Sequence, residues 1–348
     1  MNIPDVDEKK LVAFLADLLN TPSPTGLAEP AIAFTEQAFA EIPGCALQRT
    51  RKGGLLATLV GQKADAPRAL TAHVDTLGAM VKEIKNNGRL SLTQLGSYAW
   101  NTIEGEGCTV ITQSGAKIRG SILLTTPSVH VYGSQVSESK RSAETIEVRL
   151  DERVFTAEDT GDLGVGVGDF VAFDPRVETV NGFVRSRHLD DKAGVACILA
   201  AVRALHGAGL RPLQTTYILI SNYEEVGHGA AAGIPADTQE LIAVDMAAVG
   251  EGQASDEFHS SLCVKDSGGP YHHELSQRLR ALADGCGIAY KVDTYPYYGS
   301  DGEAYWRAGG DVAVALIGPG VDASHNYERT HTDALLATTQ WILAYLLN

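Results

Sequence analysis

The apolar residues near the start of the chain recur at intervals of three and four positions. Between residues 7 and 20 they are Leu11, Phe14, Leu15, Leu18 and Leu19. This spacing puts them on one face of a helix, which is expected to end at the turn of residues 21–26. A comparable pattern predicts a second helix over residues 28–41, closed by Pro43 and Gly44.

Short apolar runs elsewhere predict buried strands. The run from Tyr217 to Ile220 is rich in β-branched and aromatic residues, as in a central parallel strand covered on both faces. Further strands are expected at residues 46–50, 55–60, 69–73, 241–244, 287–293 and 312–317. Further helices are expected at residues 193–206, 271–286 and 333–347. Strands that alternate with helices predict an α/β fold with a mostly parallel central sheet flanked by helices.

Residues 81–179 follow a different pattern. They contain short alternating segments and no 3.6-residue period, and they are interrupted by many glycines, among them those of the run from Gly161 to Gly168. Such a pattern is typical of all-β structure. We therefore expect a small β-barrel here, inserted into a discontinuous α/β catalytic domain of residues 1–80 and 180–348.

Composition narrows the range of partners and compartments. The 348 residues include 28 basic and 43 acidic ones, a net charge of −15, which argues against nucleic acid or an anionic membrane as a partner. No apolar run approaches the roughly 18–20 residues of a membrane span, and residues 1–11 are charged, so a cytoplasmic protein is expected. The five cysteines are widely spaced and indicate neither a disulfide framework nor a thiolate zinc site.

Polar side chains follow several of the predicted strands. In chain order they are His73, Asp75, Asp190, Glu224, Glu225, Asp245 and His325. Open α/β sheets bind ligands at the carboxyl ends of their strands, so these side chains should meet at one edge. Imidazoles and carboxylates without thiolates suit zinc, cobalt or manganese, and the carboxylates are too many for one tetrahedral ion. Two divalent metal ions per subunit are therefore predicted, with Zn²⁺ preferred over Co²⁺ or Mn²⁺.

The predicted ligands divide into two sets that share one residue. If Asp190 bridges the ions, His73 and Asp245 complete one set, and Glu225 and His325 complete the other. The charge of two divalent ions exceeds that of the three ligand carboxylates, and the excess would lower the pKa of a shared water.

Two acidic residues remain outside these sets. Glu224 is the free neighbour of Glu225 and is expected to act as general base, taking a proton from the water and passing it to the departing amine. Asp75 is expected to accept the other ring N–H of His73 and so to fix the tautomer of that ring.

These residues together carry a resemblance to metallopeptidase family 42. The resemblance rests on five short segments in the family's order, which are His73-Val-Asp75, Leu189-Asp190-Asp191-Lys192, Glu224-Glu225-Val-Gly227, Val244-Asp245-Met246 and a late His325. The family includes the tetrahedral and glutamyl aminopeptidases, which have a co-catalytic metal pair and a β-barrel inserted in an α/β domain. The resemblance covers nearly the whole chain. It implies removal of N-terminal residues from peptides, with the ligands and the base named above.

The resemblance also implies a homo-oligomer built from dimers, commonly a tetrahedral particle of twelve subunits. The inserted domain is then expected to help join subunits and to control substrate access.

The chain departs from the family pattern near its end. The last ligand of the family usually lies in a His-Ser-Pro-like context, whereas this chain has Ser324-His325-Asn and a further histidine at His331. His325 is preferred as the ligand, and His331 is the alternative. Asp301 lies in a stretch that resembles a Gly-Thr-Asp segment near the family's site, so it is a candidate for substrate binding. His228 is a second candidate, because it follows closely after the predicted base.

Other functions remain open at this point. The same metals would serve an amidohydrolase or deacylase acting on a small acylated or osmoprotectant-type dipeptide. A glycoside hydrolase using Asp190 and Glu224 would need no metal. A binding protein without turnover would leave the clustered carboxylates unexplained.

Overall fold

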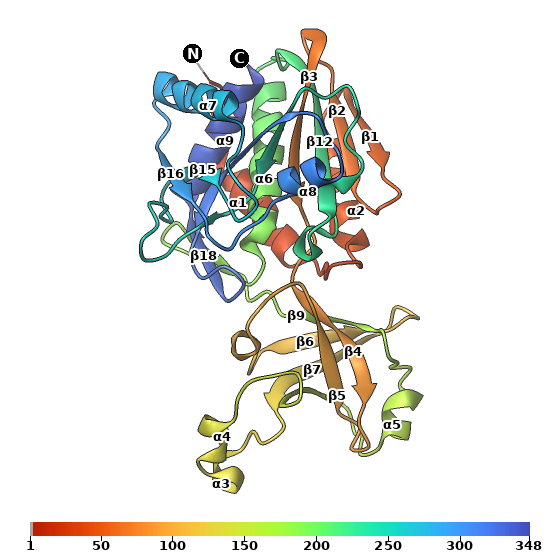
Figure 1. Cartoon of the computed structure of the whole chain (residues 1–348). Coiled ribbons are helices and arrows are strands. Elements are labelled where there is room, and N and C mark those ends of the chain that lie inside the picture. Colours follow the sequence, from red (N-terminus) through yellow and green to blue (C-terminus); the bar gives the residue numbers. More distant parts are fainter. Residues whose placement is uncertain (1–2) are drawn as a thin grey trace. The chain divides into compact units, whose positions relative to one another are not determined.

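The computed structural model of the chain describes residues 3–348. They form two compact units, the first comprising the chain up to Asp75 together with Arg176–Asn348, and the second comprising Thr76–Pro175. Figure 1 shows an α/β arrangement in the first unit and a barrel in the second. The predicted fold class is therefore confirmed.

A nine-stranded sheet forms the centre of the first unit. Across the sheet the strands are β1 (Cys45–Arg49), β2 (Leu55–Leu59), β12 (Gln214–Ser221), β3 (Lys63–His73), β13 (Glu240–Val244), β17 (Ala313–Val321), β15 (Ser260–Lys265) and β16 (Tyr290–Thr294), with β14 (Ala247–Ala248) beside β17. The central pairs β12–β3, β3–β13 and β13–β17 are parallel. Their carboxyl ends therefore meet at one edge of the sheet, as the sequence predicted.

Helices cover both faces of this sheet (Figure 1). They are α1 (Glu8–Leu19), α2 (Glu29–Ala40), α6 (Leu189–Gly207), α7 (His273–Cys286), α8 (Asp301–Arg307) and α9 (Thr332–Leu346). Helix α6 packs against α1, α9 and β3, whereas α8 contacts β3, β13 and β17. Sequence patterns predicted all of these helices except α8.

The alternation of side chains along β3 explains how both faces are filled. Leu70 and Ala72 belong to the large core that includes the apolar residues of α1, α6 and α9. Ala69 belongs to a separate cluster on the other face, and the hydroxyl of Thr71 donates to Asp301 at the start of α8, 3.0 Å away. Successive side chains of a strand point to opposite faces, so this one strand stabilises both layers.

The second unit is a closed barrel with its own apolar core. Its strands, in order around the barrel, are β4 (Gly78–Ile84), β5 (Leu90–Leu95), β8 (Ile146–Leu150), β7 (Lys117–Leu124), β6 (Gly107–Ile111) and β9 (Phe170–Phe173). All the pairs are antiparallel. The short helices of this unit are the 3₁₀ turn Trp100–Thr102, α3 (Val129–Tyr132), α4 (Gln135–Glu138) and α5 (Ala157–Asp162). Side chains such as Val110, Ile122 and Val148 fill the interior.

A small three-stranded sheet completes the first unit. It consists of β10 (Glu178–Val180), β11 (Phe183–Ser186) and β18 (Glu328–His331), all antiparallel. This sheet fixes the end of the segment that carries His325. Within residues 3–348, no helix combines the length and the apolar character that a membrane crossing requires.

Candidate metal centre

Three of the predicted ligands meet where the central strands end. His73 is the last residue of β3, Asp190 lies at the start of α6, and Asp245 directly follows β13. Their potential ligand atoms all lie within 4.8 Å of one another. The three residues are 1%, 7% and 5% exposed, so this group is enclosed by protein.

A second group shares Asp190 with the first. The potential ligand atoms of Asp190, Glu225 and His325 also lie within 4.8 Å of one another. His325 Nε2 is 3.4 Å from Asp190 Oδ2 and 3.6 Å from Glu225 Oε2. His73 Nε2 is 3.1 Å from the other oxygen of Asp190, Oδ1. The two oxygens of one carboxylate thus face two different imidazoles, which is the arrangement expected of a bridging ligand.

Glu224 lies beside the first group without belonging to either. Its Oε2 is 3.7 Å from His73 Nε2. Glu224 and Glu225 share the 3₁₀ turn Glu224–Val226 that follows β12, which directs one carboxylate toward each histidine. This turn places an acid that is not a candidate ligand next to those that are.

Asp75 holds this acidic turn in place. Its carboxylate accepts hydrogen bonds from the hydroxyl of Thr25 at 2.8 Å and from the backbone N–H groups of Glu224 at 3.2 Å and Glu225 at 3.4 Å. The nearest acceptor for Nδ1 of His73 is the backbone carbonyl of Asp75 at 2.9 Å, and the carboxylate is farther away at 3.6 Å. The expected support of His73 therefore comes from the Asp75 main chain, because the side chain is engaged with the turn.

The carboxylates of Glu328 and Asp191 hold the main chain around Asp190 by accepting backbone hydrogen bonds. The carboxylate of Glu328, in β18, accepts from the backbone N–H of Asp190 at 3.1 Å and from that of His325 at 3.0 Å. Asp191 accepts from the backbone N–H groups of His73 and Gly194, and the hydrogen bond from Gly194 caps α6. The Asp190–Asp191 peptide is cis.

The electrostatics of the cluster fit a site for cations. Burial, together with the nearby charge of Asp190, raises the pKa of Glu225 to about 8 and that of Asp245 to about 7. Burial alone would lower the pKa of His73, but its contact with Asp190 and the nearby charge of Glu224 raise it well above the usual value. Buried carboxylates at this density repel one another unless positive charge offsets them. Nitrogen and oxygen donors in this number suit two divalent ions.

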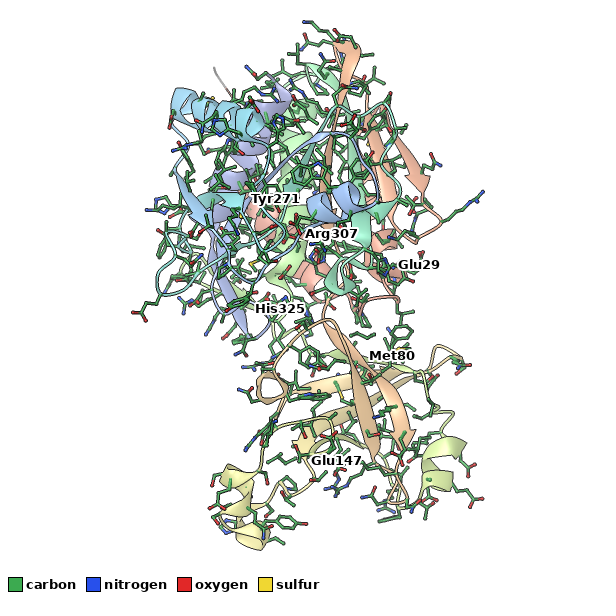
Figure 2. The ribbon with its side chains drawn as sticks, in the orientation of Figure 1. Glu29, Met80, Glu147, Tyr271, Arg307 and His325 are labelled. Carbon is green, nitrogen blue, oxygen red and sulfur yellow. The ribbon has the colours of Figure 1, made fainter. Side chains whose placement is uncertain are left out.

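A cavity of about 370 Å³ opens onto this cluster. Its lining includes Asp190, Glu224, Glu225, Asp245 and His325 from the cluster, and Tyr297, Tyr298, Glu303, Ala304 and Arg307 from the loop before α8 and from α8 itself. Figure 2 labels Arg307 and His325 on the first unit. The volume of this cavity suits a short ligand.

Comparison with known proteins assigns the chain to a family. The pattern of the M42 glutamyl aminopeptidases matches residues 53–341. The chain belongs to the M42 family. The putative aminopeptidase YhfE of Bacillus subtilis (strain 168) is 48% identical over 339 residues, which are 97% of each chain.

Solved structures of peptidases have the same fold as this M42 chain. Aminopeptidase APDkam598 of Desulfurococcus kamchatkensis superposes with a TM-score of 0.87 at 19% identity, covering 97% of this chain and 95% of that one. The TET1 peptidase of Pyrococcus horikoshii, described as assembling into a tetrahedron or a large octahedral shell, gives a TM-score of 0.84 at 21% identity, covering 97% and 99%. The earlier resemblance to family 42 is thus confirmed, and with it the assignment of the chain to the peptidases.

Two residues considered for this M42 site lie outside the cavity lining. Asp301 is 2% exposed, and its carboxylate accepts hydrogen bonds from Thr71, Ser221 and the backbone of Ala230. It ties α8 to the strands and does not line the cavity. His228 is exposed and stacks on Tyr223, with ring centroids 5.2 Å apart.

The alternative ligand His331 is used elsewhere. Its Nδ1 accepts from the backbone N–H of Asp333 at 3.1 Å and so caps α9. Its ring packs against Phe183 and Phe258. Of the two late histidines, His325 is the one within reach of Asp190.

Sequence reasoning did not assign functional positions to Tyr298, Glu303, Arg307, Lys52 or Glu328. Lys52 Nζ donates to the backbone carbonyls of His228 and, at 2.8 Å, of Gly229, which holds the segment that follows the acidic turn. The only sequence signal for α8 was its alternation of acidic and apolar residues after Ser300, and the glycines around it obscured that signal.

Proposed function

We propose that this M42 protein is an aminopeptidase that removes N-terminal residues from peptides with the help of two divalent metal ions. The observation that carries the proposal is the position of Asp190, whose two carboxylate oxygens each face a different histidine, His73 and His325. Family membership supports the peptidase activity. We infer the number of metal ions, the choice of Zn²⁺ over Co²⁺ or Mn²⁺, and the role of each residue.

We assign the ligands according to the two groups. His73 and Asp245 would hold one ion, Glu225 and His325 the other, and Asp190 both. Ions bound there would supply Lewis acidity and lower the pKa of a water molecule. The support for this assignment is the donor chemistry and the burial of excess carboxylate described above.

Glu224 is proposed as the general base. It accepts a proton from the attacking water while the water oxygen bonds to the carbonyl carbon of the peptide, and it then donates that proton to the nitrogen as the C–N bond breaks. The hydrogen bond from the Glu224 backbone N–H to Asp75 supports this role, because it fixes the turn that aims the carboxylate. A base in a fixed position is effective because the proton moves only a short distance.

The test is a panel of chromogenic substrates on protein reconstituted with Zn²⁺, Co²⁺ or Mn²⁺. Aminoacyl anilides with a free amine are expected to be cleaved, and their N-acetylated counterparts are expected to be inert. Cleavage of the acetylated set alone would instead support the related amidohydrolase or deacylase acting on small acylated dipeptides. Absence of turnover with either set under all three metals would contradict the enzyme proposal.

We also propose that the protein forms a homo-oligomer built from dimers, up to a dodecamer, with the barrel of Thr76–Pro175 helping to join subunits and to control access. The support is the assembly described for the TET1 peptidase, which shares the fold. Light scattering of the purified protein would measure the mass, and a monomer at micromolar concentration would contradict the proposal. The cytoplasmic location stays a prediction.

A further inference from the structure

The turn of residues 21–26 joins α1 to α2 and lies against the segments that carry the candidate metal centre. It precedes the match to the family pattern, which begins at residue 53. Ser23 and Thr25 are polar, but they are only 1% and 3% exposed. Buried hydroxyl groups are normally hydrogen-bonded, so the partners of these two residues indicate what the turn does.

Two contacts tie this turn to segments next to the predicted ligands. Ser23 Oγ donates to the backbone carbonyl of Val74, which directly follows β3, at 2.7 Å. Lys192 in α6 is fully buried, and its Nζ donates to the backbone carbonyl of Thr21 at 2.7 Å. A buried ammonium group is costly unless it is hydrogen-bonded, so this contact constrains the turn as well as the lysine.

The amide of Gly26 supports the residue that leads into the acidic turn, Glu224–Val226. It donates to Asn222 Oδ1 at 3.2 Å, and the same oxygen accepts from the backbone N–H of Tyr223 at 2.9 Å. Tyr223 has a left-handed φ of 74°, which is costly for a residue other than glycine unless neighbours hold it. The hydrogen bonds to Asn222 therefore hold the main chain directly before Glu224.

Thr25 holds the carboxylate to which the acidic turn is bonded. Its hydroxyl donates to Asp75 Oδ2 at 2.8 Å, and the same oxygen accepts from the backbone N–H of Glu225 at 3.4 Å. Asp75 Oδ1 accepts from the backbone N–H of Glu224 at 3.2 Å. The hydroxyl bond is the shortest of the three. The terminal torsion of an aspartate is broad, so the Thr25 hydroxyl limits rotation of the carboxylate away from the two amides.

A second buried threonine shows how this contact differs from an ordinary one. Thr35 in α2 is 0% exposed, and its hydroxyl donates to the backbone carbonyl of Ala31, one turn earlier, at 2.8 Å. Such a bond satisfies the hydroxyl within a single helix. Thr25 instead bonds to a carboxylate 50 residues away in the sequence, which in turn accepts from the backbone of Glu224.

We propose that Thr25 is a positioning residue that orients Asp75 and thereby fixes the acidic turn that carries Glu224. This proposal rests on the proposed aminopeptidase function, in which Glu224 is the general base. It extends that function to the turn of residues 21–26, outside the matched residues 53–341. The physical reason is that a displacement of about 1 Å in a reacting group costs roughly a hundredfold in rate.

Kinetics on the metal-reconstituted protein test this role, with a neutral aminoacyl anilide as substrate. Thr25→Val keeps the shape of the side chain but removes the donor. We expect kcat to fall by about ten- to hundredfold, with KM changed less than about twofold and both metals retained. Thr25→Ser keeps the hydroxyl and should recover most of the lost kcat. Thr35→Val removes a hydroxyl of similar burial from α2 and should leave kcat unchanged.

Amide hydrogen exchange of the purified full chain gives a readout that needs no turnover. The N–H groups of Glu224 and Glu225 bond to Asp75, so their exchange reports whether the carboxylate is in place. Thr25→Val should speed exchange of these two amides by about tenfold, the scale of one lost hydrogen bond. Thr25→Ser and Thr35→Val should not. If Thr25→Val cannot be purified, Thr25→Cys, with a weak donor of similar size, should give an intermediate rate.

The variants separate a positioning role from a structural one. Wild-type kcat or wild-type exchange in Thr25→Val, or wild-type exchange in Thr25→Cys where that variant replaces it, would overturn the proposal. So would a Thr25→Ser variant as impaired as Thr25→Val, because the loss would then come from packing. Equal losses in Thr35→Val would show general destabilisation, and loss of metal from Thr25→Val would show that Thr25 acts on the ligands; either result would overturn the proposal. A wild type without turnover would count against the aminopeptidase function itself, while the exchange rates would still decide whether Thr25 holds the acidic turn.

Discussion

The two halves of the candidate metal centre are built differently although they share Asp190. The half with His73 and Asp245 uses the ends of neighbouring parallel strands, and these two residues are 1% and 5% exposed. The half with Glu225 and His325 uses loops, and the His325 side chain is 34% exposed. His325 also has a left-handed φ of 62°, a conformation that costs energy unless neighbours hold it. We expect a rigid, tightly binding half and an open, more readily exchanging half.

The strongest way to break both halves at once is Asp190→Asn. An amide supplies one neutral oxygen in place of two charged ones, so neither group retains a bridging anion. We expect metal content at both halves to fall and turnover to drop by at least about 10³-fold, which corresponds to several kcal/mol of lost electrostatic stabilisation. Elemental analysis after gel filtration would measure the metal. Full occupancy at both halves would mean that the bridge lies elsewhere.

A change at Glu224 should separate catalysis from metal binding. Glu224→Gln keeps the shape of the side chain but removes its ability to accept a proton, and Glu224 belongs to neither ligand group. We expect both metals to remain and kcat to fall by at least about 10²-fold, the scale of a lost general base. Steady-state kinetics beside metal analysis would test this, with Glu138→Gln in the barrel unit as the control. Near-normal turnover would remove Glu224 from the role of base.

Removal of metal should proceed in two steps if the halves differ as described. A chelator reaches the cluster through the cavity, where the His325 side chain is 34% exposed, whereas His73 is buried and does not line the cavity. We expect about half of the metal to leave at least tenfold faster than the rest, on the scale by which local changes alter metal affinity. Timed chelation followed by metal analysis would resolve the phases, and a single phase for both equivalents would contradict the comparison.

The contrast between the halves also explains how far the sequence could be interpreted. The apolar runs before His73 and Asp245 predict buried strands, and parallel strands bring their carboxyl ends together, so the rigid half followed from pattern alone. For the loop half, the apolar run before Glu225 predicted its strand in the same way. The preference for His325 over His331 rested on the resemblance, because the pattern does not reveal the pairing of β18 with β11 or the use of His331 to cap α9.

Other gaps have equally specific causes. The sequence predicted that the carboxylate of Asp75 would accept from the His73 ring. In the structure the backbone carbonyl of Asp75 lies next to His73 Nδ1 instead, and the carboxylate accepts from the backbone of the acidic turn. Helix α8 has only seven residues, and the glycines near it resemble a turn in the sequence. The sequence therefore suggested no role for Arg307, which lines the cavity. It suggested substrate binding for Asp301, whose carboxylate is buried and accepts three hydrogen bonds from neighbouring residues.

The smallest effect should come from Glu328, which accepts hydrogen bonds from the backbone of the shared Asp190 and of His325 without touching a ligand atom. Glu328→Gln keeps an oxygen that accepts one hydrogen bond, but it replaces the other oxygen by an amide that cannot accept from the N–H of Asp190 or His325. We expect metal affinity at the open half to weaken by about tenfold, the lower end for partners that orient ligands, with the half at His73 little changed. Competition with a chelating dye would measure both affinities. The control is Glu257→Gln, because Glu257 forms a nearby ion pair with Arg329. Equal weakening of both halves would show that Glu328 acts on the shared Asp190, and an unchanged pair of affinities would show that the loop holds His325 without it.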